Sequence, residues 1–473
     1  MLARKIAFNT IISAVARIIA TGLALVTIGL ATRYLTKTEW GEYSLVLTFG
    51  GIFAVLAEWG LYQLMVREIS RPGADEQKIA GNLFTMRLMI SLFIFVLAPL
   101  ISLLFPYSAQ ARLGILIGMS GYWLLSGTQV LMGVFQKHLR MDKISLADVA
   151  GRAVQLMLVF LFIKMGLGFF WIVGALVFGA IANFLLVIWF AQKYIRLKLT
   201  FDFDFWKKSL RQSFPLAISN ILVMIYFSTD SLFLSAFKPI TDVGIYRLPY
   251  KILESLIFFP SMFVGLVMPL LSRAAFSDWP RFKNVFERSF DVLMIFALPL
   301  IGGTLVLSPA IINLLGGGNY PESVAVLDIL IVAVGVIFLG TLFSFTLISI
   351  EKQKILLWIS AAGAVFNVAA NIILIPRWSY FAAAATTVLT ETLVAILMIV
   401  AIRRYLRFWP KLGAFLKSLL AALLMVAVIW YLRPLNLFIL LALAPVIYFG
   451  LLYLIKGFST RDILALIKKD ASG

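Results

Sequence analysis

The dominant pattern along this chain is a series of apolar stretches separated by short polar turns. A membrane-crossing helix needs about 20 mainly apolar residues, and fourteen stretches reach that length. They are approximately 9–32, 42–65, 83–105, 113–135, 147–165, 169–191, 213–236, 248–272, 291–315, 323–349, 355–375, 380–402, 412–432 and 434–455. The runs are continuous, whereas the strands of a membrane β-barrel alternate over about ten residues. The pattern predicts an all-α integral membrane protein with about fourteen transmembrane helices.

Composition excludes several other classes of protein. Of the 473 residues, 62% are hydrophobic and 13% charged, whereas soluble domains have about 45–50% apolar and about 25% charged residues. The apolar content also excludes a disordered chain. There is no Cys and one His, His138, so a disulfide framework, a cysteine metal site, a histidine metal cluster and a Ser-His-Asp arrangement are all excluded.

The basic residues predict the orientation in the membrane, because cytoplasmic loops carry an excess of Lys and Arg. When successive spans alternate sides, 30 of the 41 basic residues fall on one side, eight fall on the other, and Arg17, Arg152 and Lys251 remain inside spans. We therefore expect both termini in the cytoplasm and an uncleaved first span. The net charge of +19 then reflects topology and not nucleic-acid binding.

An internal repeat divides the chain. Thr38–Leu45 and Thr241–Leu248 share the pattern Thr, acid, any, Gly, any, Tyr, any, Leu, and Ser70-Arg71 matches Ser272-Arg273 at nearly the same offset. The repeat predicts two pseudo-symmetric six-helix lobes around a central substrate site, although chance recurrence of Gly and Tyr at interfacial turns is an open alternative. The expected parts are a first lobe at 1–191, a basic cytoplasmic linker at 192–212, a second lobe at 213–402, and two further spans with a cytoplasmic tail at 403–473.

Three basic residues of the first lobe are candidate substrate contacts. Ionisable residues inside a membrane are costly and are usually functional, and Arg17, Arg87 and Arg152 all lie in its inner half. Arginine binds phosphate bidentately, so this cluster favours an anionic substrate. Structural alternatives stay open: Arg17 pairs with Glu58, Arg152 pairs with Asp148 at i, i+4, or Arg87 extends to the interface.

The second lobe has a further basic candidate, Lys251, which either contacts substrate or forms an ion pair with Asp230. Buried carboxylates have raised pKa values, so acidic residues in spans are candidates for gating or for ion coupling; a neutral structural carboxyl group is the alternative. The acidic candidates are Glu58, Asp230, Glu254 and Glu391. The polar cavity candidates are Asn220, Asn367 and Asn371.

The sequence lacks the G-x-x-x-x-G-K-[ST] loop of ATP-driven proteins, and the predicted outer loops are short, so an enzyme is the least favoured class.

The chain resembles the polysaccharide-exporter branch of the MATE-like MOP flippase superfamily, a branch that includes the O-antigen repeat-unit flippases. The resembling residues are Asn9-Thr10 to Arg17, Tyr34 to Tyr43, Val66 to Arg71, Gly244-Ile245-Tyr246 through Lys251 to Met268–Arg273, Pro299 to Leu315, Gly317 to Tyr320, and Ser323 to Leu330.

The resemblance implies a transporter of the inner (plasma) membrane that works by alternating access. Its substrate would be an undecaprenyl-diphosphate-linked oligosaccharide, and its partners would be the bilayer and polysaccharide-assembly proteins, with no nucleic acid. Arg17 is similar to the first-span arginine of related lipid flippases. No cofactor is expected beyond a coupling proton or sodium ion. Flipping of a peptidoglycan lipid precursor is the main alternative; a MATE-type drug antiporter is disfavoured because it would need an acidic cavity.

Overall fold

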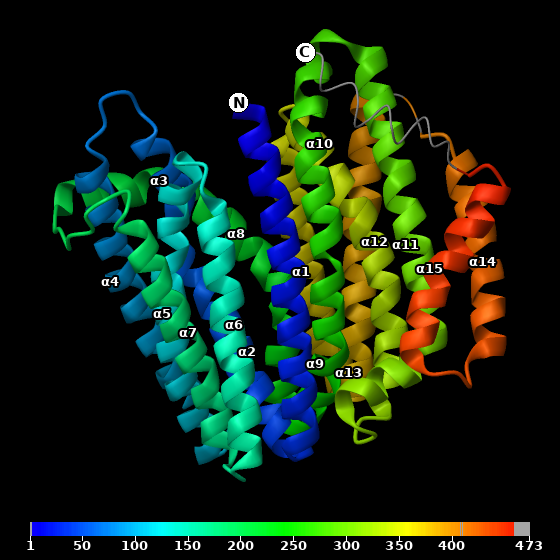
Figure 1. Ribbon diagram of the computed structural model, residues 1–473, viewed down its shortest axis with the longest axis horizontal. Coiled ribbons are helices and arrows are strands. Elements are labelled where there is room, and N and C mark those ends of the chain that lie inside the picture. The colour runs from blue at the N-terminus through cyan, green and yellow to red at the C-terminus, as the bar shows by residue number, and fades with distance from the viewer. Residues whose placement is uncertain (1, 407, 409, 458–473) are drawn as a thin grey trace. The chain divides into compact units, whose positions relative to one another are not determined.

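The structure is a computed structural model that describes the backbone of residues 2–406, 408 and 410–457, and their side chains except at 2–11, 215, 216, 218–220, 222, 223 and 225–228. Every regular element in these ranges is a helix (Figure 1). The helices are α1 (Leu2–Tyr34), α2 (Lys37–Glu58), α3 (Leu61–Ile69), α4 (Glu76–Ser102), α5 (Ala109–Lys137), α6 (Met141–Lys164), α7 (Phe169–Ala191), α8 (Phe203–Phe237), α9 (Ile240–Leu256), α10 (Phe258–Ser277), α11 (Trp279–Gly316), α12 (Glu322–Ser349), α13 (Gln353–Leu406), α14 (Gly413–Leu432) and α15 (Leu437–Leu454).

The helices confirm the predicted fold class. Within the described residues, twelve helical segments are long and apolar enough to cross a membrane. One of them, α13, covers two of the expected spans, because Pro376 and the non-helical backbone of Ser379 divide it. The seventh expected span corresponds to α8.

Two expected spans are interrupted in the structure. The second is divided into α2 and α3 by Trp59 and Gly60, which both have a left-handed backbone with φ 46° and 66°. The eighth is divided into α9 and α10 at Ile257. Pro260 has no N–H to donate to the carbonyl of Leu256, four residues earlier, and this missing bond accounts for the second interruption.

The chain forms two compact units. The first comprises Met1–Arg247, Leu315–Asn319 and Asn371–Tyr380. Within it, α5 packs against α2, α4 and α7, and α6 packs against α1 and α7 (Figure 1). Helices α6 and α7 approach closely at Gly151 and Gly179, where a Cβ on either glycine would lie 2.8 Å from the carbonyl oxygen of the other.

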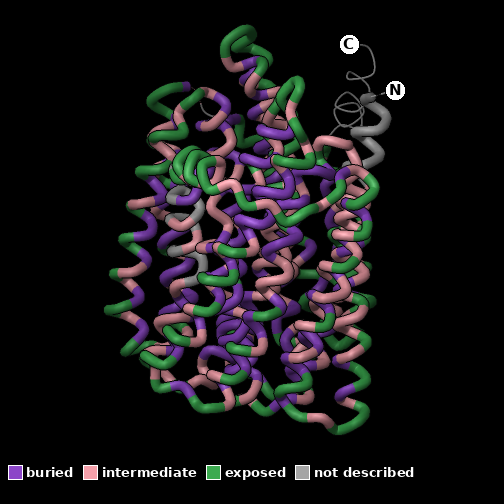
Figure 2. Tube along the Cα trace, turned by 90° about the vertical axis from the view of Figure 1, so that its left-hand side faces the viewer, coloured by how far each residue is buried: buried purple, intermediate pink, exposed green. Residues whose placement is uncertain are grey.

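The second unit comprises Leu248–Leu314, Tyr320–Ala370 and Phe381–Gly473. Helix α10 packs against α12, and α14 packs against α15. A buried apolar cluster joins α14 and α15 to α11, with Leu307, Met425 and Tyr448 among its members. Along individual helices, buried positions alternate with exposed ones (Figure 2), as expected for helices that pack on one face. The lobe boundaries expected from the sequence stay a prediction.

The two copies of the repeated sequence pattern meet in the first unit. The Trp40 indole N–H donates to the carbonyl of Gly244 at 3.1 Å. A Cβ on Gly41 would overlap the carbonyl oxygen of Ile240, and a Cβ on Gly244 would lie 2.8 Å from the Trp40 ring. The first turns of α2 and α9 therefore touch backbone to backbone, and this contact explains why both copies of the pattern carry glycine.

Arg87 on α4 caps the end of the interrupted helix α2. Its side chain is buried; Nε donates to the carbonyl of Ser126 at 3.2 Å, Nη2 donates to Gln129 Oε1 at 3.0 Å, and Nη1 donates to the carbonyl of Ala57. Carbonyls in the last turn of a helix lack helical donors, and a positive charge is favourable there. Arg87 thus ties α4 to α2 and α5.

The glycine contact predicts that Gly41→Ala destabilises the protein. The added methyl group must displace the backbone of α9, and overpacking of this kind costs about 1–3 kcal/mol. The matched control is Gly51→Ala on the same helix, where a Cβ would meet no atom within 4 Å. Thermal unfolding of the purified variants in detergent should show a lower midpoint for Gly41→Ala alone. Equal midpoints for the two variants would contradict the close contact.

The capping role predicts that Arg87→Met lowers the folded yield and the unfolding midpoint. The substitution leaves the buried Ala57 carbonyl in the last turn of α2 without its side-chain donor, at about 1–3 kcal/mol. Arg71→Met is the control, because Arg71 is largely exposed and its buried partner Glu68 keeps its 2.9 Å ion pair with Arg67 when the 2.8 Å pair with Arg71 is lost. A wild-type melting profile for Arg87→Met would remove Arg87 from its structural role.

Candidate functional site

The first candidate region lies where α1 packs against α6. Ser145 donates to Ser13 at 3.2 Å near one end of the helix pair. At the other end, Tyr34 donates to the carbonyl of Leu167 at 2.9 Å. These two contacts define parallel helices in a constant register. Arg17, four residues after Ser13, therefore lies level with the first half of α6.

Arg152 and Asp148 occupy that part of α6. Arg152 Nε lies 3.2 Å from Asp148 Oδ1, and their side chains are 34% and 33% exposed. The i, i+4 pair expected from the sequence is therefore present. Arg17 is exposed on the adjacent helix. Two guanidinium groups thus share one level of the α1–α6 pair, and neither is fully enclosed by protein.

The other two first-lobe candidates lie at the end of α2. Arg87 is enclosed by its bonds to α2 and α5, which favour a structural role. Glu58 is half-buried and interacts electrostatically with Arg87. The structure thus brings Glu58 and Arg87 together, and the pairing of Glu58 with Arg17 stays a prediction.

A second candidate region is a buried carboxyl group shared by three helices. Asp230 on α8 accepts a hydrogen bond from the Tyr246 hydroxyl of α9 at 3.0 Å and another from the Asn371 amide of α13. All three side chains are buried. The low dielectric constant of such a site strengthens each bond and makes an uncompensated charge costly. Asp230 and Asn371 are thus brought together as one polar cluster.

Tyr246 was not among the candidates chosen from the sequence, although it is the tyrosine of the second repeat. Its equivalent in the first repeat, Tyr43, is also buried. Recurrence of Tyr in the two copies was the sequence signal for a buried aromatic side chain at this position.

The second unit contains the other candidates. Lys251 Nζ lies 2.6 Å from Glu254 Oε2 on the same helix, and both side chains are about one-third exposed. Lys251 thus has a different partner from the Asp230 suggested by the sequence. Asn367 is buried and donates to Thr390 Oγ1 at 3.3 Å, and Glu391 is also buried. The side chain of Asn220 lies outside the described residues.

The basic side chains of the first region can bind anionic groups. Guanidinium groups can form paired hydrogen bonds to phosphate or carboxylate. Within the described part of the chain, no group of three or more His, Asp or Glu residues could hold a metal ion.

Several known proteins resemble this chain. A membrane protein of Methanocaldococcus jannaschii, itself uncharacterized, is 22% identical over 92% of both chains. The fold is similar to that of the lipid II flippase MurJ in an inward closed conformation, with a TM-score of 0.78, 15% identity, and 96% of this chain and 100% of MurJ covered.

A second similar structure is the inward-facing form of a multidrug resistance MATE family transporter of the MOP superfamily, with a TM-score of 0.69, 15% identity, and 84% of this chain and 98% of the transporter covered. At such low identity the two structures show the fold alone. The profile of a family described as "Polysaccharide biosynthesis protein" matches residues 6–275, more than half of the sequence. This multi-pass membrane protein therefore belongs to the polysaccharide biosynthesis protein family and has the fold of MOP-superfamily transporters.

Proposed function

We propose that the protein is a flippase that moves an undecaprenyl-diphosphate-linked oligosaccharide, the repeat unit of an O-antigen, capsule or exopolysaccharide, across the inner (plasma) membrane. It would work by alternating access, from the cytoplasmic to the outer leaflet, with both termini in the cytoplasm. Membership of the polysaccharide biosynthesis protein family is the observation that carries the proposal. The partly exposed basic side chains within membrane spans agree with it.

A charge in the hydrocarbon core of a membrane is costly. A charged side chain in a span needs bonded partners or water. Arg17 and Arg152 are at least one-third exposed, so exposure to lipid tails would be unfavourable and contact with a hydrated path is favoured. Two guanidinium groups at one level can bind a diphosphate bidentately. In this proposal Arg17 and Arg152 bind the diphosphate and Arg87 keeps its structural bonds, while Lys251 is a separate substrate-binding candidate of the second unit.

We propose coupling to an ion at the acidic residues of the second half. Asp230 is buried and accepts hydrogen bonds from Tyr246 and Asn371, and carboxyl groups inside a membrane are suited to carry a proton or to bind a cation. A sodium ion or a proton is the proposed coupling ion, and Glu391 of the second unit is a separate candidate for the same role. Collapsing the sodium gradient and the proton gradient separately in a transport assay distinguishes the two ions.

A peptidoglycan lipid-precursor flippase is the second candidate, because the similar MurJ structure is named as a lipid II flippase. Both candidates transport a lipid diphosphate. A MATE-type organic-cation antiporter is third, since the guanidinium groups beside the α1–α6 contact would repel a cation.

Deletion of the gene should cause a lipid-diphosphate-linked saccharide to accumulate on the cytoplasmic leaflet, because its route to the outer leaflet is lost. Leaflet-resolved labelling of extracted lipids measures this. The sugar of the accumulated lipid separates the first two candidates: a polysaccharide repeat unit supports the first and a peptidoglycan precursor supports the second. A wild-type distribution of every lipid-linked saccharide would contradict both.

Arg17→Ala should abolish transport while the protein remains folded in the membrane, because the substitution removes a diphosphate-binding group. Lys164→Ala is the matched control, since Lys164 is an exposed basic residue at the far end of α6. Transport in a complemented deletion strain and protein level in isolated membranes are measured together. Normal transport by Arg17→Ala would exclude Arg17 from the substrate site.

A further inference from the structure

The segment that follows α7 and continues into the first turns of α8 is strongly basic and exposed. Six of its residues carry positive charge and are all exposed: Lys193, Arg196, Lys198, Lys207, Lys208 and Arg211. The same stretch has two acidic residues, Asp202 and Asp204. We call residues 193–211 the basic segment. Its charge favours an anionic partner.

The basic segment also exposes large apolar side chains. Leu199, Phe201 and Phe203 are 61%, 58% and 70% exposed. The rings of Phe201 and Phe203 lie 5.9 Å and 5.2 Å from the ring of Trp206. Aromatic side chains beside basic ones are typical of the membrane–water interface, where the rings enter the boundary of the acyl chains and the charges meet the headgroups.

Several contacts with α4 fix the conformation of the basic segment. The Thr200 N–H donates to Thr85 Oγ1 at 3.1 Å. Asn82 Oδ1 accepts from the Asp202 N–H at 2.9 Å and from the Trp206 indole N–H at 3.2 Å. The surface is therefore preformed, so binding to it has a smaller entropic cost.

Asp202 adds to this anchoring from the start of α8. Its side chain accepts from the Phe205 N–H at 3.0 Å and lies 3.3 Å from Lys78 Nζ. The Phe205 N–H and the Lys78 ammonium hold the pKa of the Asp202 carboxyl below its ordinary value. The carboxylate therefore stays charged, and the cap and ion pair persist, at neutral pH.

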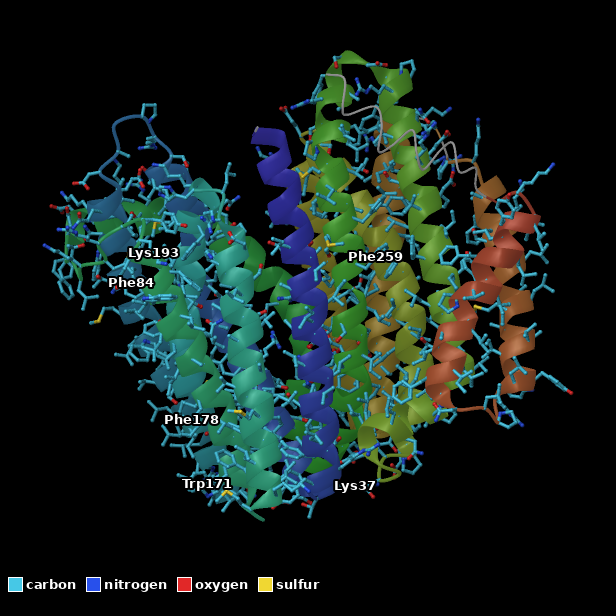
Figure 3. The ribbon with its side chains drawn as sticks, viewed as in Figure 1. Lys37, Phe84, Trp171, Phe178, Lys193 and Phe259 are labelled. Carbon is cyan, nitrogen blue, oxygen red and sulfur yellow. The ribbon has the colours of Figure 1, made fainter. Side chains whose placement is uncertain are left out.

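The position of the basic segment favours a lipid partner over an acidic protein. Trp171, Phe178 and Trp189 are exposed along α7, as expected of a lipid-facing side, and Lys193 follows at its end. Lys193 Nζ lies 4.6 Å from the Trp189 ring centroid. Figure 3 labels Trp171 and Lys37 toward one end of the first unit and Lys193 toward the other. The basic segment thus continues the lipid-facing side of α7 at its edge.

We propose that residues 193–211 form a docking surface for the headgroups of anionic phospholipids, with Phe201 and Phe203 inserted at the boundary of the acyl chains. Basic clusters directly beside a transmembrane helix attract anionic lipid surfaces. The docking holds the α4–α8 side of the protein at the membrane surface. This surface is separate from the proposed substrate site, and its occupancy depends on the lipid composition of the membrane whatever the transported molecule is.

The test measures lipid retention by the full-length protein in native mass spectrometry, with detergent micelles that contain equal amounts of phosphatidylglycerol and phosphatidylcholine. The variant Lys193→Gln/Lys198→Gln/Lys207→Gln/Lys208→Gln should retain phosphatidylglycerol on the order of tenfold less than wild type. The control variant neutralises four exposed basic residues of the second unit: Arg273, Arg281, Arg403 and Arg404. It should retain phosphatidylglycerol like wild type.

A second variant, Phe201→Ser/Phe203→Ser, measures the contribution of the two aromatic side chains to lipid binding separately from that of the basic residues. Salt screens exposed charges, so phosphatidylglycerol retention by this variant should be lost at lower salt than in wild type. Equal unfolding midpoints of all variants in phosphatidylcholine alone show that the fold is intact.

Three results would overturn the proposal. They are wild-type phosphatidylglycerol retention by the four-residue variant, an equal loss in the control variant, and displacement of the lipid by poly-glutamate from wild type alone, which would indicate an acidic protein partner.

Discussion

A charged side chain inside a membrane-spanning helix must be bonded on all sides or stay in contact with water, and this constraint determines the roles of the charged residues in the spans of this protein. Arg87 meets it by bonding, since its guanidinium donates to carbonyls on α2 and α5 and to an amide on α5. Asp230 is buried and accepts hydrogen bonds from Tyr246 and Asn371. Arg17 and Arg152 remain partly exposed. The same constraint thus separates structural charges from those available to a substrate.

The second feature of the fold is the contact between its repeated segments. Gly41 and Gly244 let the first turns of α2 and α9 touch, and the Trp40 indole bonds across the contact. The tyrosine of each copy is buried, and the tyrosine of the second copy donates to Asp230. One short sequence pattern therefore specifies both a helix contact and a buried tyrosine.

Most of the fold could be predicted from the sequence, because apolar runs of sufficient length have few alternatives to a membrane helix. The interruptions could not: a single Gly60 is tolerated in many helices, and its effect depends on whether a residue such as Arg87 can cap the exposed carbonyls. The hydrogen-bond and ion-pair partners of polar side chains were harder to predict than the helices. Lys251 had two acidic residues within plausible reach, and the choice of Glu254 depends on helix rotation. The contact between Tyr246 and Asp230 joins two helices, so spacing alone could not reveal it.

The most direct test of the central claim is a transport assay with purified protein in liposomes that contain a labelled undecaprenyl-diphosphate oligosaccharide. Accessibility of the sugar to an impermeant reagent is followed over time, without nucleotide. The account predicts that the protected fraction becomes accessible with wild-type protein and stays protected with Arg17→Ala. Equal rates for wild type, Arg17→Ala and protein-free liposomes would contradict it.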